Sequence, residues 1–112
     1  MLNQNATWFD VCDLTDIPDG GMLQVKHDEK NIVMYHVDEG IFATDNICSH
    51  AFALLSEGWL QDGLIECPLH GALFDIKTGE VKRGPAECGV KSYPVKEENG
   101  RVFCALPPPA EA

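Results

Sequence analysis

The sequence contains no run of about 18 apolar residues, the length that a membrane-spanning helix needs. Residues 1–5 have neither a basic region nor an apolar stretch, so we expect no secretory signal there. Basic residues are scarce: 8 Lys and Arg stand against 18 Asp and Glu, which gives a formal net charge of −10. Nucleic acids and anionic membranes both attract basic surfaces, so neither is expected as a partner. Because neither a membrane span nor a secretory signal is expected, the expected compartment is the cytoplasm.

Sustained helical periodicity is also missing, and the chain has no internal repeat. Short runs of β-branched and aromatic residues alternate instead with turn residues, which is typical of a strand meander. Residues 22–27 divide into two alternating sets, the period of a strand. The other expected strands cover residues 8–12, 32–37, 41–44, 59–60, 64–66, 72–75, 91–96 and 101–105. The pattern predicts an all-β fold in one domain, residues 1–112.

The strand pattern breaks between about residues 45 and 85. Residues 51–56 could form one short helical turn, and Gly58 and Gly63 bracket an expected hairpin. We therefore expect a smaller, loop-rich subdomain at about 45–85, inserted between strands of a larger sheet. Further along, Asn99-Gly100 is a strong hairpin signal.

The five cysteines are odd in number and irregularly spaced, so they do not predict a disulfide framework. Two of them lie close to histidines, in Cys48-Ser49-His50 and, sixteen residues later, in Cys67-Pro68-Leu69-His70. Thiolates and imidazoles suit iron–sulfur clusters, zinc or copper. In an extended segment, residues two apart point the same way with roughly 6–7 Å between them, which suits two neighbouring metals better than one tetrahedral ion.

Other readings of these cysteines and histidines are open but less favoured. Zinc is disfavoured because the loops lack the paired C-x-x-C spacing of common structural zinc sites. Neither cysteine sits in a recognisable nucleophile motif. We expect Cys12, Cys88 and Cys104 to be small buried apolar residues. The large aromatic side chains expected in the core are Trp8, Phe9, Phe42, Trp59, Phe74, Tyr93 and Phe103.

The two Cys–His loops resemble the motif of Rieske ferredoxins, and Gly84-Pro85-Ala86 resembles the proline loop that covers the cluster in that family. The similarity extends over essentially the whole chain. It is greatest to the ferredoxin components of bacterial aromatic-ring-hydroxylating dioxygenase systems. The resemblance implies a β-sandwich or barrel base of antiparallel strands with a small inserted cluster-binding subdomain.

The same resemblance implies one Rieske-type 2Fe–2S cluster, with Cys48 and Cys67 on one iron and His50 and His70 on the other. It implies a monomeric one-electron carrier rather than an enzyme. Electrons would come from an NAD(P)H-dependent flavin ferredoxin reductase and go to a terminal Rieske non-haem iron aromatic-ring dioxygenase. A small Rieske-like subunit of an assimilatory nitrite reductase is the alternative.

Within the wider Rieske superfamily, the respiratory type has two further cysteines where this chain has Ala53 and Leu69, so their disulfide cannot form here. That type also places hydroxyl residues where this chain has Ala72 and Phe74. Hydrogen bonds to cluster sulfurs stabilise the reduced state, so their loss predicts a potential in the lower part of the Rieske range.

Overall fold

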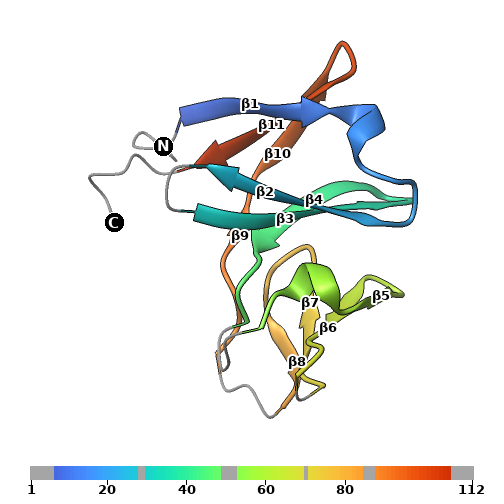
Figure 1. Cartoon of the computed structure of the whole chain (residues 1–112), viewed down its shortest axis with the longest axis vertical. Coiled ribbons are helices and arrows are strands. Elements are labelled where there is room, and N and C mark those ends of the chain that lie inside the picture. The colour runs from blue at the N-terminus through green and yellow to red at the C-terminus, as the bar shows by residue number, and fades with distance from the viewer. Residues whose placement is uncertain (1–6, 28–29, 49–52, 70, 85–87, 107–112) are drawn as a thin grey trace.

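The computed structural model describes residues 7–27, 30–48, 53–69, 71–84 and 88–106, and these are arranged almost wholly as antiparallel strands (Figure 1). The strands are β1 (Thr7–Asp13), β2 (Met22–His27), β3 (Lys30–Val37), β4 (Gly40–Asp45), β5 (Trp59–Gln61), β6 (Leu64–Glu66), β7 (Leu73–Asp75), β8 (Val81–Arg83), β9 (Ser92–Tyr93), β10 (Val95–Glu98) and β11 (Arg101–Leu106). Two short 3-10 helices, η1 (Leu14–Asp16) and η2 (Leu55–Glu57), lie between them. The prediction of an all-β fold is confirmed. No helix in these ranges is long and apolar enough to cross a membrane.

The strands form three sheets, two of which make up a base. One base sheet has the order β1-β11-β10 and the other β2-β3-β4-β9. The third sheet, β5-β6-β7-β8, stands beneath the base in Figure 1 and is called the small sheet below. The small sheet and the loops beside it contain both predicted cysteine ligands.

Strand β3 separates two hydrophobic cores. Ile32 and Met34 contribute to the core between the two base sheets, whereas Val33 and Tyr35 contribute to the core shared with the small sheet. Successive side chains of a strand point to opposite faces, so this alternation follows directly from the extended backbone. All four residues are at most 1 % exposed, which explains why the sequence shows a continuous apolar run here instead of apolar–polar alternation.

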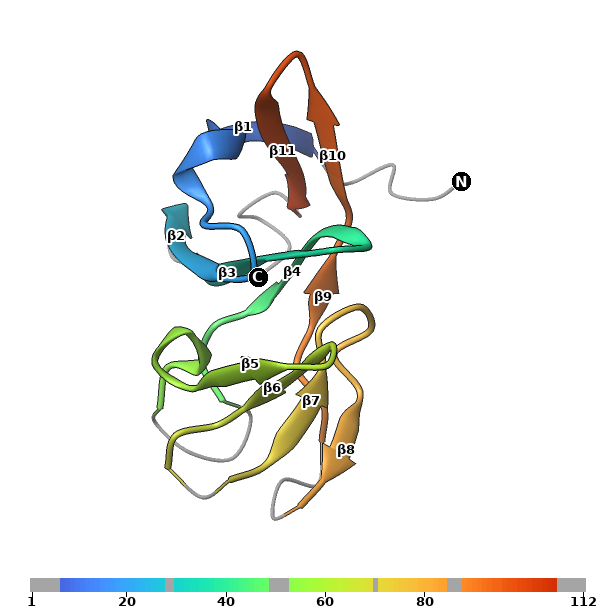
Figure 2. The ribbon, with the colours of Figure 1, turned by 90° about the vertical axis from the view of Figure 1, so that its right-hand side faces the viewer.

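The chain leaves the base and returns to it through two paired strands. β4 ends at Asp45, and β9 pairs with β4 through Ala43–Tyr93 and Thr44–Ser92. The amide of Asp45 also donates to the carbonyl of Lys91 over 2.8 Å. Figure 2 shows β9 as the connection from the lower part of the molecule into the base. The small sheet is therefore an excursion that begins and ends at neighbouring points of one sheet.

Most expected strands are present, with differences at their ends. β2 has the expected bounds, but the segment 91–96 forms two strands, β9 and β10, because Pro94 has no amide proton to donate within a ladder. Strand β8 was not expected, since its residues are mostly polar. It pairs with β7 across a register shift and is the last strand of the small sheet. The hairpin at Asn99-Gly100 is confirmed: both residues have positive φ, 54° and 79°, as a type I′ turn requires.

Three expectations about burial are wrong. Trp8 is 44 % exposed and Trp59 is 60 % exposed, although both were expected in the core. Both lie in edge strands, β1 and β5, and on one side of each no other strand pairs with it among the described residues. Cys88 is exposed as well, because it lies in the connection between β8 and β9 rather than in a strand.

Candidate metal centre

The two predicted cysteine ligands occupy equivalent positions at the ends of two hairpins. Cys48 follows the bridge between Ile47 and Leu54, and its amide donates to the carbonyl of Ala53 over 2.9 Å. Cys67 follows the paired residues Glu66 and Leu73, and its amide donates to the carbonyl of Ala72 over 2.8 Å. Each cysteine amide thus bonds the carbonyl five residues ahead, which closes two loops of equal length.

Both cysteines are buried in the same apolar core. Cys48 is 4 % exposed and Cys67 is fully buried, and they share this core with Leu55, Ile65 and Phe74. Thiolates buried among such side chains need a compensating positive charge, which a bound metal supplies. Two buried sulfurs at matching hairpin ends are therefore a donor set that fits an iron–sulfur group.

His50 and His70, the other two predicted ligands, lie outside the described residues, as does Pro85 of the expected covering loop. In the part of the chain that is described, no group of three or more His, Cys, Asp or Glu side chains is placed to hold a metal ion. The structure therefore brings together the two predicted sulfur ligands, and their pairing with the histidines stays a prediction.

A buried asparagine anchors the first loop. The carboxamide of Asn46 donates to Asn31 Oδ1 and Ser56 Oγ, both over 3.0 Å, and accepts from the Ser56 amide over 2.7 Å. Its backbone amide donates to the Asn31 carbonyl, and its carbonyl accepts from the Leu55 amide. Asn46 thereby ties β3 to η2, two residues before Cys48. Sequence reasoning assigned it no role, because an Asn after a strand is also a common turn residue.

Two tyrosine hydroxyls hold the end of β4, from which the first loop departs. Tyr93 donates to Asp45 Oδ1 over 2.6 Å, and Tyr35 bonds Thr44 Oγ1 over 2.9 Å. Burial raises the pKa of both phenols, and for Tyr93 the nearby Asp45 carboxylate raises it further. Both hydroxyls therefore stay protonated and keep these hydrogen bonds at neutral pH.

The second loop is fixed by close backbone packing and by an arginine. A Cβ on Gly58 would overlap the Glu66 carbonyl oxygen and lie 3.2 Å from the Pro68 ring, so the chain after η2 presses directly on the start of this loop. At the other end of the loop, Arg83 of β8 donates from Nη2 to the Gly71 carbonyl over 2.8 Å.

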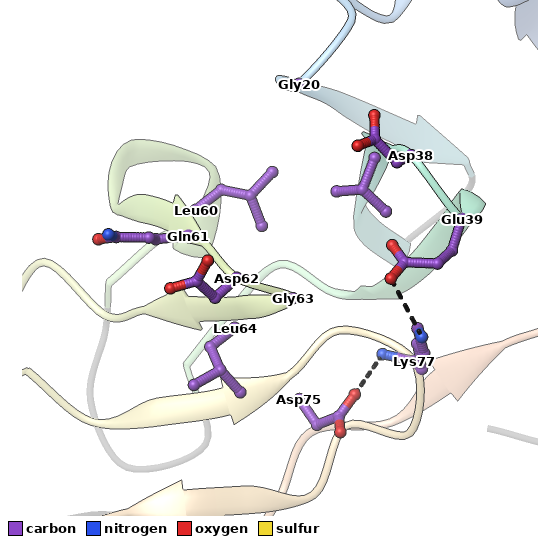
Figure 3. A pocket seen from close by; sticks show the side chains of 11 residues that line it. Gly20, Asp38, Glu39, Leu60, Gln61, Asp62, Gly63, Leu64, Asp75 and Lys77 are labelled. Carbon is purple, nitrogen blue, oxygen red and sulfur yellow. Dashed lines mark hydrogen bonds and ion pairs between the residues drawn. The ribbon is translucent and has the colours of Figure 1, made fainter.

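A separate acidic cleft of about 610 Å³ lies where the small sheet meets the base (Figure 3). Four carboxylates line it, from Asp38, Glu39, Asp62 and Asp75. Lys77 is the cation of the lining: its Nζ is 4.0 Å from Glu39, and its amide donates to Asp75 over 2.8 Å. The cleft includes the turn of the β5–β6 hairpin, the end of that hairpin away from Cys67. It is therefore an acidic surface distinct from the metal centre.

Known proteins of similar sequence support an iron–sulfur centre at this site. Residues 7–94 match the family described as Rieske [2Fe-2S] domain. The chain is 46 % identical, over 99 residues, to the ferredoxin component of the naphthalene 1,2-dioxygenase/salicylate 5-hydroxylase systems of a Ralstonia species, an alignment that covers 88 % of this chain and 95 % of the relative.

Two solved structures share the fold over nearly their full length. The ferredoxin of Sphingomonas yanoikuyae B1 matches with a TM-score of 0.84 and 36 % identity, covering 90 % of this chain and 100 % of that one. A chain from the complex of reduced oxygenase and oxidised ferredoxin in carbazole 1,9a-dioxygenase matches with a TM-score of 0.82 and 33 % identity, covering 92 % and 94 %. The predicted cofactor, one Rieske-type 2Fe–2S cluster, is confirmed by the family match. With its paired cysteine hairpins, the chain belongs to the Rieske 2Fe–2S domain family.

Proposed function

We propose that this protein is the ferredoxin component of a bacterial aromatic-ring dioxygenase system. It carries one electron at a time to a terminal oxygenase and catalyses no reaction of its own. The observation that carries this proposal is the pair of matching hairpins with buried cysteines, in a chain that aligns with 95 % of a dioxygenase ferredoxin.

For the ligands, we assign Cys48 and Cys67 to one iron and His50 and His70 to the other. The equal loops support this assignment, because each delivers one cysteine from the same hairpin position. Such a cluster accepts and releases a single electron. The chain's own contribution is to hold both cysteines at the hairpin ends and to exclude water from their sulfurs, which it does with the fully buried Leu55 among others.

The side chains around the cysteines favour a low reduction potential. Ala72 and Phe74 are fully buried in the core that contains both cysteines, and neither carries a hydroxyl that could bond to sulfur. Such bonds would stabilise the more negative, reduced cluster. We therefore place the midpoint in the lower part of the range of about −150 to +300 mV for Rieske centres. A midpoint well above about +100 mV would contradict this reasoning.

The partners we propose are a flavin-dependent ferredoxin reductase as donor and a terminal oxygenase as acceptor. Two apolar side chains flank the cysteine loops and are exposed, Ile47 at 46 % and Leu69 at 52 %. With a net charge of −10 on the whole chain, they suit a small, transient interface that charge steers toward basic partner surfaces. We further propose a monomer in the cytoplasm. Its single domain, residues 1–112, would contain a cluster-binding subdomain at about residues 45–85.

The proposal is tested with the protein purified under anaerobic conditions. Iron and acid-labile sulfide should each be present at about two per chain, as a 2Fe–2S cluster requires, and the reduced protein should give the spin-resonance signal of a Rieske centre. Cys67→Ala and His70→Ala should abolish that signal, whereas Cys104→Ala, which removes a buried cysteine of the base, should keep it. A silent reduced wild type would refute the ligand assignment. Reconstitution with a purified dioxygenase and its reductase then tests the carrier role, and copurification with a large sirohaem subunit would favour the nitrite reductase alternative.

A further inference from the structure

An arginine outside the predicted ligand motifs reaches the second cysteine loop. Arg83 is the last residue of β8, and its Nη2 lies 2.8 Å from the carbonyl oxygen of Gly71 and 3.9 Å from Glu66 Oε2. The strand register explains this contact: Glu66 pairs with Leu73, and Leu73 pairs with Arg83. The two charged residues therefore lie in one row across the small sheet, with Leu73 between them.

The backbone of the loop lies directly against both charged side chains. Gly71 has a φ of +78°, and a Cβ there would lie 3.5 Å from Glu66 Oε2 and 3.6 Å from Arg83 Nη2. The amide of Gly71 donates to the carbonyl of Cys67 over 3.1 Å. Arg83 thus binds the segment that closes the turn begun at Cys67, immediately after the proposed ligand His70.

Stability alone is a weak explanation for this contact. The side chains of Arg83 and Glu66 are 58 % and 38 % exposed, and exposed ion pairs contribute little to the free energy of unfolding. The hydrogen bond to the Gly71 carbonyl does fix the direction in which the guanidinium lies, and so the position of its charge beside the loop. Reduction of a cluster adds one negative charge, which a nearby cation stabilises. In a chain with a net charge of −10, a cation fixed at this loop opposes the field of the surrounding acids.

We propose that Arg83 is a positioning residue that fastens the second ligand loop and raises the reduction potential of the cluster. Glu66 opposes the second effect, since its carboxylate lies beside the same guanidinium. In the sequence, Arg83 directly precedes Gly84, the first residue of the segment that resembles the covering loop. This inference rests on the proposed ligand assignment.

The test compares midpoint potentials and reduced-state spin-resonance spectra of matched variants. Lys82→Gln is the control, because it removes the same charge from the adjacent residue of β8, whose ammonium pairs with Glu80 over 3.3 Å instead of with the loop. Arg83→Gln should lower the potential by more than Lys82→Gln does and should shift the spectral g-values. Arg83→Lys, which keeps the charge, should lie between Arg83→Gln and the wild type. Glu66→Gln should raise the potential.

Equal shifts in Arg83→Gln and Lys82→Gln would overturn the proposal, since they would show only a general effect of net charge. Unchanged g-values in Arg83→Gln would overturn the positioning role. If Arg83→Gln does not retain its cluster, the potentials of Arg83→Lys and Glu66→Gln still test the proposal. Arg83→Lys should have a lower potential than the wild type, and Glu66→Gln a higher one. A potential that does not rise in Glu66→Gln contradicts the proposal. A wild type without a Rieske spectrum would refute the ligand assignment itself, which separates the two failures.

Discussion

The phenol of Tyr93 donates a 2.6 Å hydrogen bond to the carboxylate of Asp45, across the two strands through which the chain leaves and re-enters the base. Asp45 is the last residue of β4, and three residues later the chain reaches Cys48. The same strand end receives a second bond, from the Asp45 amide to the Lys91 carbonyl. The position of the first cysteine loop therefore depends on contacts made in the base.

Replacing Tyr93 with Phe should lower the free energy of unfolding by about 1–2 kcal/mol, because a hydrogen bond to a charged group is lost while Asp45 regains access to water. Urea unfolding of the apo and holo proteins measures this effect. Tyr35→Phe, which removes the bond to Thr44, is the control for loss of a phenol. We expect Tyr93→Phe to release iron faster than Tyr35→Phe, and equal rates would show that Asp45 does not steady the loop.

Asn46→Ala should be among the most damaging substitutions outside the ligands. It removes three side-chain hydrogen bonds to Asn31 and Ser56 at a site that is fully buried. The expected loss is about 2–4 kcal/mol, because partner groups are left unsatisfied away from water. Chemical denaturation and iron content measure it.

Gln24→Ala provides the comparison, since its amide donates to the same Asn31 oxygen from the exposed surface. There water replaces the lost donor, so the change should be at most about 0.5 kcal/mol. Similar losses in Asn46→Ala and Gln24→Ala would contradict the role given to the buried network.

Two glycines near the small sheet should respond to alanine for different reasons. Gly58→Ala places a methyl group into the Glu66 carbonyl oxygen, so the backbone before Cys67 has to move. Gly63→Ala meets no atom within 4 Å but sits at a φ of +78°, where a side chain costs about 1–2 kcal/mol. Gly58→Ala should therefore perturb the cluster spectrum as well as stability, whereas Gly63→Ala should lower only the melting temperature. A normal cluster spectrum in Gly58→Ala would show that the second loop tolerates displacement.

Alkaline pH should destabilise the fold through Cys104. Burial raises the pKa of this thiol from an ordinary value near 9 to about 12. Between these values the unfolded chain ionises and the folded one does not. The free energy of unfolding should thus be unaffected below about pH 9 and fall by about 1.4 kcal/mol per pH unit above it.

Cys104→Ala should remove the contribution of this thiol to the fall of the unfolding free energy with pH. The comparison is made between pH 9 and 10, because tyrosines of the unfolded chain ionise near pH 10 and above. Val102→Ala empties space in the same core without removing a titrating group, so it should lower stability and keep the slope. Urea unfolding of apo protein at several pH values separates the two. An unchanged slope in Cys104→Ala would exclude this thiol as the cause.

Adding a hydroxyl next to Cys67 should raise the reduction potential. Ala72 lies opposite Cys67 in the second hairpin and is fully buried, so Ala72→Ser offers a donor that the wild type lacks. Direct voltammetry measures the midpoint, and Ala105→Ser, at a buried position of the base, is the control. A midpoint that does not rise in Ala72→Ser would remove the stated reason for a low-potential centre.

The sequence predicted what depends on neighbours along the chain. Alternation located β2, and the Asn99-Gly100 turn located a hairpin. The spacing of the cysteines and histidines indicated a metal centre, and the resemblance of both loops to the Rieske motif implied the cofactor. Contacts between residues that are far apart in the sequence could not be predicted in this way. Asp45 and Tyr93 are 48 residues apart, and nothing in the sequence around either one indicates the other.

The same limit applies to Arg83 and Asn46. Arg83 is a charged residue in a short polar segment, and its contact with Gly71 depends on how β7 and β8 pair. Asn46 resembles any turn asparagine until the fold brings Asn31 and Ser56 beside it. The sequence could not predict the exposure of Trp59 either, because its strand lies at the edge of a sheet and the strand order is fixed by tertiary pairing.

The pairing of β4 with β9 has a consequence for how such carriers diversify. Because the excursion starts and ends at adjacent hydrogen-bonded residues, its length can change without altering the register of any base strand. The entropy of closing a loop rises only slowly with its length, so insertions between these two strands are tolerated far better than insertions inside the base. A change in the small sheet or its loops can thus alter the metal centre while the pairing of the base strands is kept.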